Sequence, residues 1–179
     1  MDATTAHLHY FNVASGLTKT ADDVDDFYMY RLYGWSREER DQIFAKYGVD
    51  IHRESLPYPN ALQNLEEMYR RHKVSFITAR PEFCQDVTVE WFKYYNVNYH
   101  HLSFTEDKLA ECQALGIDVL IDDAPHYAEQ FVQSNQPFIL YDQPYNRHIH
   151  HELIYRARNW MEVMQHIADI EKDRVNKRV

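Results

Sequence analysis

The chain has 179 residues and a formal net charge of −9. Its length predicts a single domain, and its apolar share of 45% predicts a substantial core. The negative charge argues against binding duplex DNA through its phosphates, and we expect no nucleic-acid partner. The sequence has no signal sequence and no apolar run of roughly 20 residues, and Cys84 and Cys112 form no disulfide framework. We therefore expect a cytoplasmic protein without a membrane partner. The sequence leaves a homo-oligomer possible.

The first predicted helix follows Thr20. Thr20 and Asp23 have the spacing of a capping box, and apolar residues then recur at helical spacing through Leu32. Gly34 is the expected stop, because glycine readily takes the left-handed conformation that ends many helices.

The second predicted helix opens at a clearer capping box, formed by Ser36 and Glu39. It is expected to end at Gly48. We interpret residues 18–55 as a small helical cap inserted into one domain that spans residues 1–179.

Strands and helices alternate from Asn60 onward. Strands are expected at residues 74–77, 101–104, 119–121, 138–141 and 153–155, and helices are expected to begin near residues 60, 87, 108, 126 and 160. This order predicts an α/β fold of the Rossmann-like, three-layer kind, with a parallel sheet covered on both faces. Such sheets bind ligands beyond the carboxyl ends of their strands.

Asp122 and Asp123 follow one of these apolar strands directly. Adjacent carboxylates repel each other, and a cation explains them best. Mg²⁺ prefers such hard oxygen ligands together with a substrate phosphate. The alternative is that Asp123 caps the next helix, in which Pro125 would occupy an early position.

Thr78 and Lys108 are the other candidates for binding an anion. Thr78 follows a second apolar strand, where its hydroxyl can donate to a phosphate oxygen, although an ordinary turn threonine is the alternative. Lys108 can neutralise a phosphate, although a lysine at a helix start is usually solvated. Arg80 can clamp a second anionic group or form a surface ion pair.

Together, these residues resemble the haloacid dehalogenase superfamily of phosphohydrolases. The matching stretches are Phe-Ile-Thr-Ala-Arg at 76–80, Lys108, and Leu-Gly-Ile-Asp-Val-Leu-Ile-Asp-Asp at 115–123. Residues 140–147, with Tyr10-Phe11-Asn12 and Trp160, are similar to its 5′(3′)-deoxyribonucleotidase-like branch, which includes bacterial nucleotidases. The resemblance covers nearly the whole chain. It implies Mg²⁺-dependent removal of phosphate from a nucleoside monophosphate or a similar small phosphate ester.

The resemblance also implies roles for the site residues. Thr78 and Lys108 would be catalytic groups of the second and third family motifs. The substrate would be bound by Thr78, Ala79, Arg80 and Lys108, and Mg²⁺ by Asp122 and Asp123. The base would be selected in the helical cap and the Arg80 loop. The rings of Tyr28, Tyr30 and Trp35 are available there for stacking, although most such rings serve as packing residues.

The family's first motif is not found in the sequence as written. This motif, Asp-x-Asp-Gly-Thr after an apolar strand, would supply the nucleophile and would precede a stretch like residues 4–12. Asp2 has no strand before it and no glycine after it, so we do not assign it as the nucleophile. The first central strand is therefore missing, which leaves either a gap that its neighbours close or unpaired backbone groups in the core.

Three explanations stay open. In the first, the sequence is written from an internal methionine of a longer, active nucleotidase. In the second, the chain is a shortened, catalytically silent relative that binds a nucleotide or a protein. In the third, another chain supplies the strand. As written, the chain is expected to be inactive, because transfer through an aspartyl-phosphate requires the attacking carboxylate.

Overall fold

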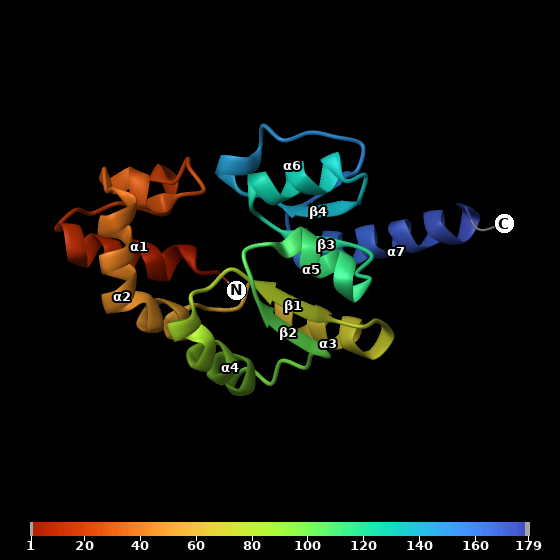
Figure 1. Cartoon of the computed structure of the whole chain (residues 1–179), viewed down its shortest axis with the longest axis horizontal. Helices are drawn as coiled ribbons and strands as arrows, with labels where there is room; N and C mark the ends of the chain where they lie inside the picture. Colours follow the sequence, from red (N-terminus) through yellow and green to blue (C-terminus); the bar gives the residue numbers. More distant parts are fainter. Residues whose placement is uncertain (1, 178–179) are drawn as a thin grey trace.

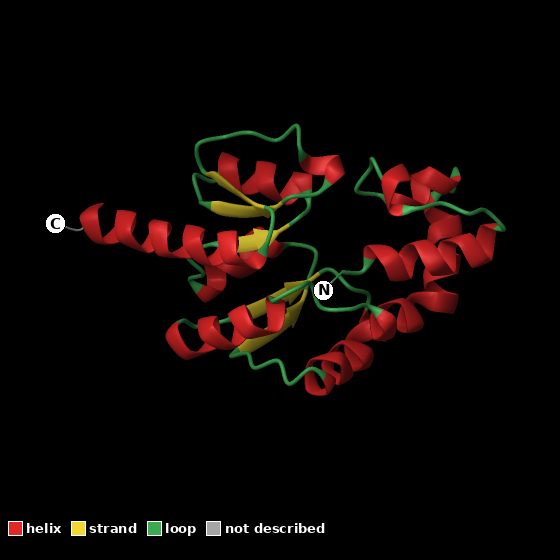
Figure 2. Cartoon of the chain, turned by 180° about the vertical axis from the view of Figure 1, so that it is seen from behind, coloured by secondary structure: helices red, strands yellow, loops and turns green. Residues whose placement is uncertain are grey.

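The computed structural model describes residues 2–177, and its strands form two small parallel sheets (Figures 1 and 2). Strand β1 (Ser75–Thr78) pairs with β2 (His101–Phe104). The second sheet has the order β3 (Leu120–Asp122), β4 (Phe138–Tyr141) and β5 (Ile154–Ala157). Parallel strands require crossover connections, and helices supply most of them here.

Helices cover both faces of these strands. Their bounds are α1 Thr4–Ser15, α2 Arg37–Glu54, α3 Ala61–Arg71, α4 Gln85–Tyr94, α5 Lys108–Leu115, α6 Pro125–Gln133 and α7 Trp160–Lys177, with short 3₁₀ turns at Ala21–Asp23, Met29–Tyr33, Glu82–Cys84 and Pro144–Asn146. Helices α5 and α6 pack together on one side, and α3 packs with α7 on the other (Figure 1). This arrangement confirms the predicted three-layer, Rossmann-like α/β fold.

Most of the predicted elements from Asn60 onward are confirmed. The strands at 101–104 and 138–141 have the predicted bounds, the helix expected near residue 108 begins at Lys108, and the other strands differ by one or two residues at an end. Asn60 begins α3 from a left-handed backbone conformation (φ 61°), which asparagine tolerates better than most residues.

The predicted helix after Thr20 is wrong. Asp23 does accept a hydrogen bond from the Thr20 backbone N–H (2.8 Å), as a capping box requires, and a second one from the Thr20 hydroxyl (3.0 Å). The box closes only the 3₁₀ turn Ala21–Asp23, and the chain is extended at Val24. A capping box stabilises one turn, and the conformation of the residues after that turn depends on packing rather than on the cap.

The predicted end of the second helix at Gly48 is also wrong. The Ser36–Glu39 capping box is present, but α2 continues through Gly48 to Glu54. A Cβ at Gly48 would lie 3.1 Å from Cε2 of Phe83 and 3.3 Å from Cδ1 of Phe44. Here glycine allows close packing of rings against the helix instead of ending it.

The amino-terminal helices form a unit with its own core, to one side of the strands (Figure 1). Helix α1, which the sequence did not predict, packs on α2. The buried residues shared by this unit are Ala6, Leu8, Phe11, Val24, Tyr30, Tyr33 and Ile51. Helix α1 therefore shares a core with residues of the segment 18–55, and the interpretation of that segment as a cap insertion stays a prediction.

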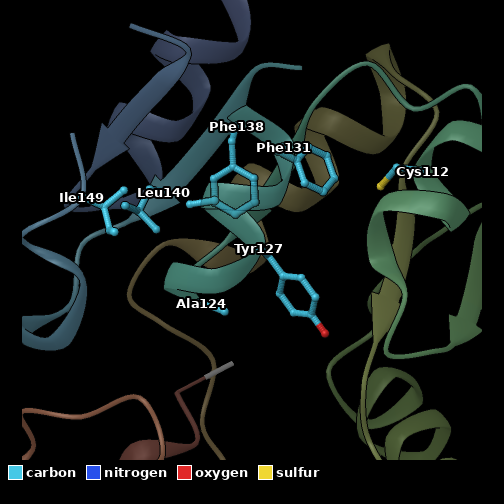
Figure 3. Packing of buried hydrophobic residues seen from close by; sticks show 8 residues of the cluster. Cys112, Ala124, Tyr127, Phe131, Phe138, Leu140 and Ile149 are labelled. Atoms are coloured by element: carbon cyan, nitrogen blue, oxygen red, sulfur yellow. The ribbon is translucent and has the colours of Figure 1, made fainter. Parts of the chain in front are cut away.

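A second core lies between α6 and β4 (Figure 3). The rings of Phe131 and Phe138 meet edge to face, with centroids 5.3 Å apart. Cys112 is buried in this core, and both it and Cys84 are free thiols. Within the described residues, no helix combines the length and apolar character that crossing a membrane would require.

His52 makes the stability of the fold pH-dependent. Burial, followed by the charges of Arg80 and His7, lowers the pKa of His52 to about 2, whereas an unfolded histidine titrates near 6.5. Below pH 6.5, His52 therefore binds a proton in the unfolded chain but not in the folded chain. The free energy of unfolding falls as the pH falls toward 2. Between pH 7.5 and 5.5 this loss is about 1.4 kcal/mol.

Urea unfolding at pH 7.5 and 5.5 tests this prediction. His52→Leu is expected to remove about 1.4 kcal/mol of the pH-dependent loss. His148→Leu, at an exposed position, is the matched control and should retain it. An unchanged pH dependence in His52→Leu would show that the buried ring is not its source.

Candidate active site

Strands β1 and β3 end at the same edge of the fold. Thr78 is the last residue of β1 and Asp122 the last residue of β3. Both line one cavity of about 270 Å³, to which Arg80 also contributes. The two strands therefore run in the same direction, and their carboxyl ends form one polar edge, as expected for a parallel α/β sheet.

Lys108 is bound to Asp122. Its Nζ lies 2.6 Å from Oδ2 of Asp122 and 4.7 Å from the centre of the Tyr127 ring. Only 8% of Lys108 is exposed, so the alternative of a solvated lysine at a helix start is wrong. Asp107, whose carboxylate accepts from the N–H of Ala110 (3.0 Å), caps α5 and fixes Lys108 at its first turn.

Asp123 is held by a tyrosine that the sequence did not single out. The hydroxyl of Tyr145 donates to Oδ2 of Asp123 at 2.5 Å. Burial and, second, the neighbouring Asp122 carboxylate raise the pKa of Asp123 well above its ordinary value. Lys108 therefore neutralises only part of the negative charge of Asp122 and Asp123.

The alternative that Asp123 caps the next helix is wrong. The N-cap of α6 is Ala124, and no side chain caps its first turn. Instead, Oδ1 of Asp122 accepts from the N–H of Ala124 at 2.9 Å. Pro125 does occupy the first position of α6, as expected.

The donor set fits a divalent cation with hard oxygen ligands. Two carboxylates adjoin at the edge, and the one with the raised pKa would be stabilised in its charged form by a cation. Within residues 2–177, no three histidine, cysteine or acidic side chains converge as a metal cage. Mg²⁺ commonly uses one or two carboxylates and completes its shell with water and substrate phosphate, so it needs no such cage.

Thr78, Ala79 and Arg80 form the turn after β1. The backbone N–H of Arg80 points to Oγ1 of Thr78 (3.4 Å), so Thr78 is part of a turn, and the carbonyl of Thr78 accepts from the N–H of Thr105. Nη1 of Arg80 donates to Oγ1 of Thr88 at 2.8 Å. Burial lowers the pKa of Arg80 to about 10, and Ala79 is exposed.

Asn146 is a further site residue that sequence reasoning missed. It is fully buried, and its Nδ2 donates to the carbonyls of Asp123 (2.9 Å) and Tyr141 (2.8 Å). Its Oδ1 accepts from the N–H of Gln143 (3.1 Å) and from Nη1 of Arg156 (2.8 Å). Asn146 thereby ties the loop after β4 to the end of β3. Its place in residues 140–147, a stretch that carried the family resemblance, was the available signal.

Replacing Asn146 by alanine is expected to lower the free energy of unfolding by about 2 kcal/mol, because buried donors and acceptors lose their partners. Asn98→Ala removes an exposed amide that donates to Glu66 and is the matched control, with an expected effect within about 0.5 kcal/mol. Urea unfolding of both variants measures the difference. Equal stabilities would mean that the loop does not depend on Asn146.

Two aromatic side chains of the helical unit lie beside the site. The Phe27 ring is 5.7 Å from that of Tyr145, which binds Asp123. The Tyr28 ring lies parallel to that of His126, with centroids 6.3 Å apart, and is exposed. Tyr30 and Trp35, which were expected to be available for stacking together with Tyr28, pack in the core of the helical unit.

Parallel strands in a Rossmann-like fold, whose carboxyl edge gathers a threonine, a lysine and two aspartates, define a nucleotidase-like phosphohydrolase of the haloacid dehalogenase superfamily. Residues 2–173 match the family model described as "5' nucleotidase, deoxy (Pyrimidine), cytosolic type C protein". The chain therefore belongs to this 5′-nucleotidase family.

Curated relatives agree with this assignment. "Putative nucleotidase YqfW" of Bacillus subtilis is 28% identical over 161 residues, which cover 87% of this chain and 82% of that protein. "Putative nucleotidase BH1399" of Halalkalibacterium halodurans is 27% identical over 158 residues, 87% and 81% of the two chains. "Nucleotidase CA_C3379" of Clostridium acetobutylicum is 23% identical over 146 residues, 80% and 76% of the two chains.

Proposed function

We propose that the edge formed by β1, β3 and α5 binds the phosphate of a nucleoside monophosphate, or of a similar small phosphate ester, together with one Mg²⁺. The observation that carries this proposal is the bond between Lys108 and Asp122 beside Asp123. Two carboxylates and one ammonium at a strand end carry a net negative charge, so an anion can bind there only together with a cation. Relatives named as nucleotidases support the nucleotide as substrate class.

Each residue has one role in this proposal. Asp122 and Asp123 hold Mg²⁺, which when bound would polarise a phosphate oxygen. Lys108 neutralises a second oxygen, and the Thr78 hydroxyl donates to a third. The backbone of the exposed Ala79 and the side chain of Arg80 contact the rest of the substrate, and the ring of Tyr28 stacks on a base. Tyr145 and Asn146 fix Asp123 in place.

Hydrolysis requires an attacking carboxylate in addition to this cradle. Within residues 2–177, we assign none. Oδ1 of Asp2 accepts from the N–H of Thr4 at 3.0 Å, and the backbone of Asp2 pairs with Leu56, so this carboxylate stabilises the start of α1. This observation favours a second candidate function, a catalytically silent nucleotide-binding protein, because binding a substrate is not the same as turning it over.

Calorimetry with a deoxynucleoside monophosphate, combined with an assay of phosphate release, separates these functions. We expect binding that requires Mg²⁺. Release of phosphate would identify the chain as a hydrolase, and binding without release would identify the silent form. The absence of Mg²⁺-dependent binding by both nucleoside monophosphates and inorganic phosphate would refute the proposal.

A further inference from the structure

An apolar cavity of about 490 Å³ separates the two sheets. It runs along β1 and β3, from Lys73 and Asp118 at one end to Ile77 and Asp123 at the other. We call this cavity the slot. Helices α3 and α7 line it as well, and its apolar walls include Leu65, Met68, Phe76, Ile121, Ile167 and Ile170. Protein interiors rarely hold an apolar space this large without an occupant.

The backbone of β1 turns hydrogen-bonding groups toward the slot. On the β2 side, the carbonyls of Val74 and Thr78 accept from the N–H groups of His100 and Thr105, both at 2.8 Å. Successive residues of a strand point to alternate sides, so Ser75 and Ile77 direct their N–H and C=O groups away from β2. Among the described residues, no strand pairs with β1 on that side.

The facing edge of β3 has the same property. The N–H groups of Phe138 and Asp142 donate to the carbonyls of Leu153 and Ala157, on the side of β5. Because successive residues point to alternate sides, the backbone groups of Ile139 point toward β3. Ile139 is opposite Ile121, and in a parallel ladder such a residue bonds to the two neighbours of its partner. The backbone groups of Ile121 therefore face the slot. Unpaired backbone groups on both walls are costly unless a further backbone satisfies them.

The side chains along the slot agree with an added central strand. Phe138, Ile139 and Leu140 of β4 are fully buried, whereas the residues of β1 and β3 are only half-buried. The indole N–H of Trp160, which lines the slot, is buried and has no acceptor among the described residues. A strand in the slot would bury these side chains and present carbonyl oxygens.

We propose that the slot binds one extended peptide segment as a parallel strand between β1 and β3. The occupant is apolar on both faces, because helices cover both, and its carboxyl end lies at Asp122 and Asp123. Such strand addition joins the two sheets into one. This inference concerns the slot alone and does not depend on the proposed nucleotide chemistry.

The test uses the full chain and an acetylated, amidated peptide of about eight residues, with a central valine–isoleucine run and terminal lysines for solubility. We expect saturable binding by calorimetry and a raised melting temperature. The same peptide with alternate N-methylated residues keeps its apolar surface but can form its ladder with only one of the two walls, and it should bind at least about tenfold more weakly. Equal binding of both peptides would overturn the proposal.

A matched pair of protein variants tests the walls. Ser75→Pro removes a slot-facing N–H at the first residue of β1, where proline is tolerated, and should weaken binding at least about tenfold. Ser75→Ala keeps that N–H and should bind as the wild type does. If Ser75→Pro fails to fold, the N-methylated peptide still decides.

Two further measurements test the direction of the strand and its occupant. A nitroxide at the carboxyl end of the peptide should broaden NMR signals near Asp123, and one at the amino end those near Asp118; the reverse pattern would contradict a parallel strand. Sedimentation should show a monomer that binds one peptide. A stable dimer that binds no peptide would mean that a second copy fills the slot, which would also overturn the proposal.

Discussion

Replacing Asp122 by asparagine is expected to weaken Mg²⁺ binding, measured by calorimetry with inorganic phosphate present, by on the order of 100-fold. Asp122 lies next to Asp123 and bonds to Lys108 at 2.6 Å, so its carboxylate connects the proposed cation site to the proposed phosphate site. Asparagine keeps the shape and can still accept from the N–H of Ala124, which bonds to Asp122 in the wild type. The loss therefore reports on charge and not on the turn.

Asp118→Asn is the matched control for this variant. Asp118 precedes β3 at the opposite end of the strand, where its carboxylate is exposed and paired with Arg174. Its replacement should leave Mg²⁺ binding unchanged. If both variants bind Mg²⁺ as the wild type does, the cation site is not at Asp122. A circular dichroism melt of each variant shows that the comparison is made between folded proteins.

Replacing Lys108 by methionine is expected to lower the free energy of unfolding at pH 7 by about 3 kcal/mol. Methionine fills a similar volume, but Asp122, whose side chain is 13% exposed, would lose its cationic partner beside Asp123. The remaining acids can escape this repulsion by taking up a proton. The folded pKa of Asp123, which is already raised, would rise further, so the destabilisation should grow as the pH rises through that pKa and shrink toward pH 4.

Lys93→Met is the control for the loss of a cation from a helix. Lys93 is exposed in the last turn of α4, and its replacement should change stability by no more than about 0.5 kcal/mol. Urea unfolding at pH 7 and pH 4.5 measures both variants. Added Mg²⁺ should also restore part of the stability of Lys108→Met. A Lys108→Met protein as stable as the wild type would show that the ion pair does not hold the site together.

The sequence predicted the strands well because their signals are local. Short apolar runs such as 101–104 and 138–141 are bounded by polar or turn residues, and the alternation with helices specifies a parallel sheet. Polar residues directly after such runs must reach the carboxyl edge, so Thr78 and Asp122 could be placed there from the sequence.

Features that depend on packing were not predictable in the same way. Helix α1 has no side-chain cap at Ala3, and its buried residues are covered by packing against α2. Tyr145 and Asn146 reach Asp123 from a loop more than 20 residues further along the chain. No periodic pattern in the sequence predicts such a long-range contact. The expected gap in the sheet is present, and its neighbours leave it open, as the separate sheets of β1 and β3 show.

A crystal structure of the chain grown with Mg²⁺ and inorganic phosphate tests the central claim most directly. We predict one cation bound to Asp122 and Asp123, and one phosphate oxygen each on Lys108 and Thr78. Phosphate bound at another surface, with Asp122 and Asp123 contacting no cation at saturating Mg²⁺, would contradict it.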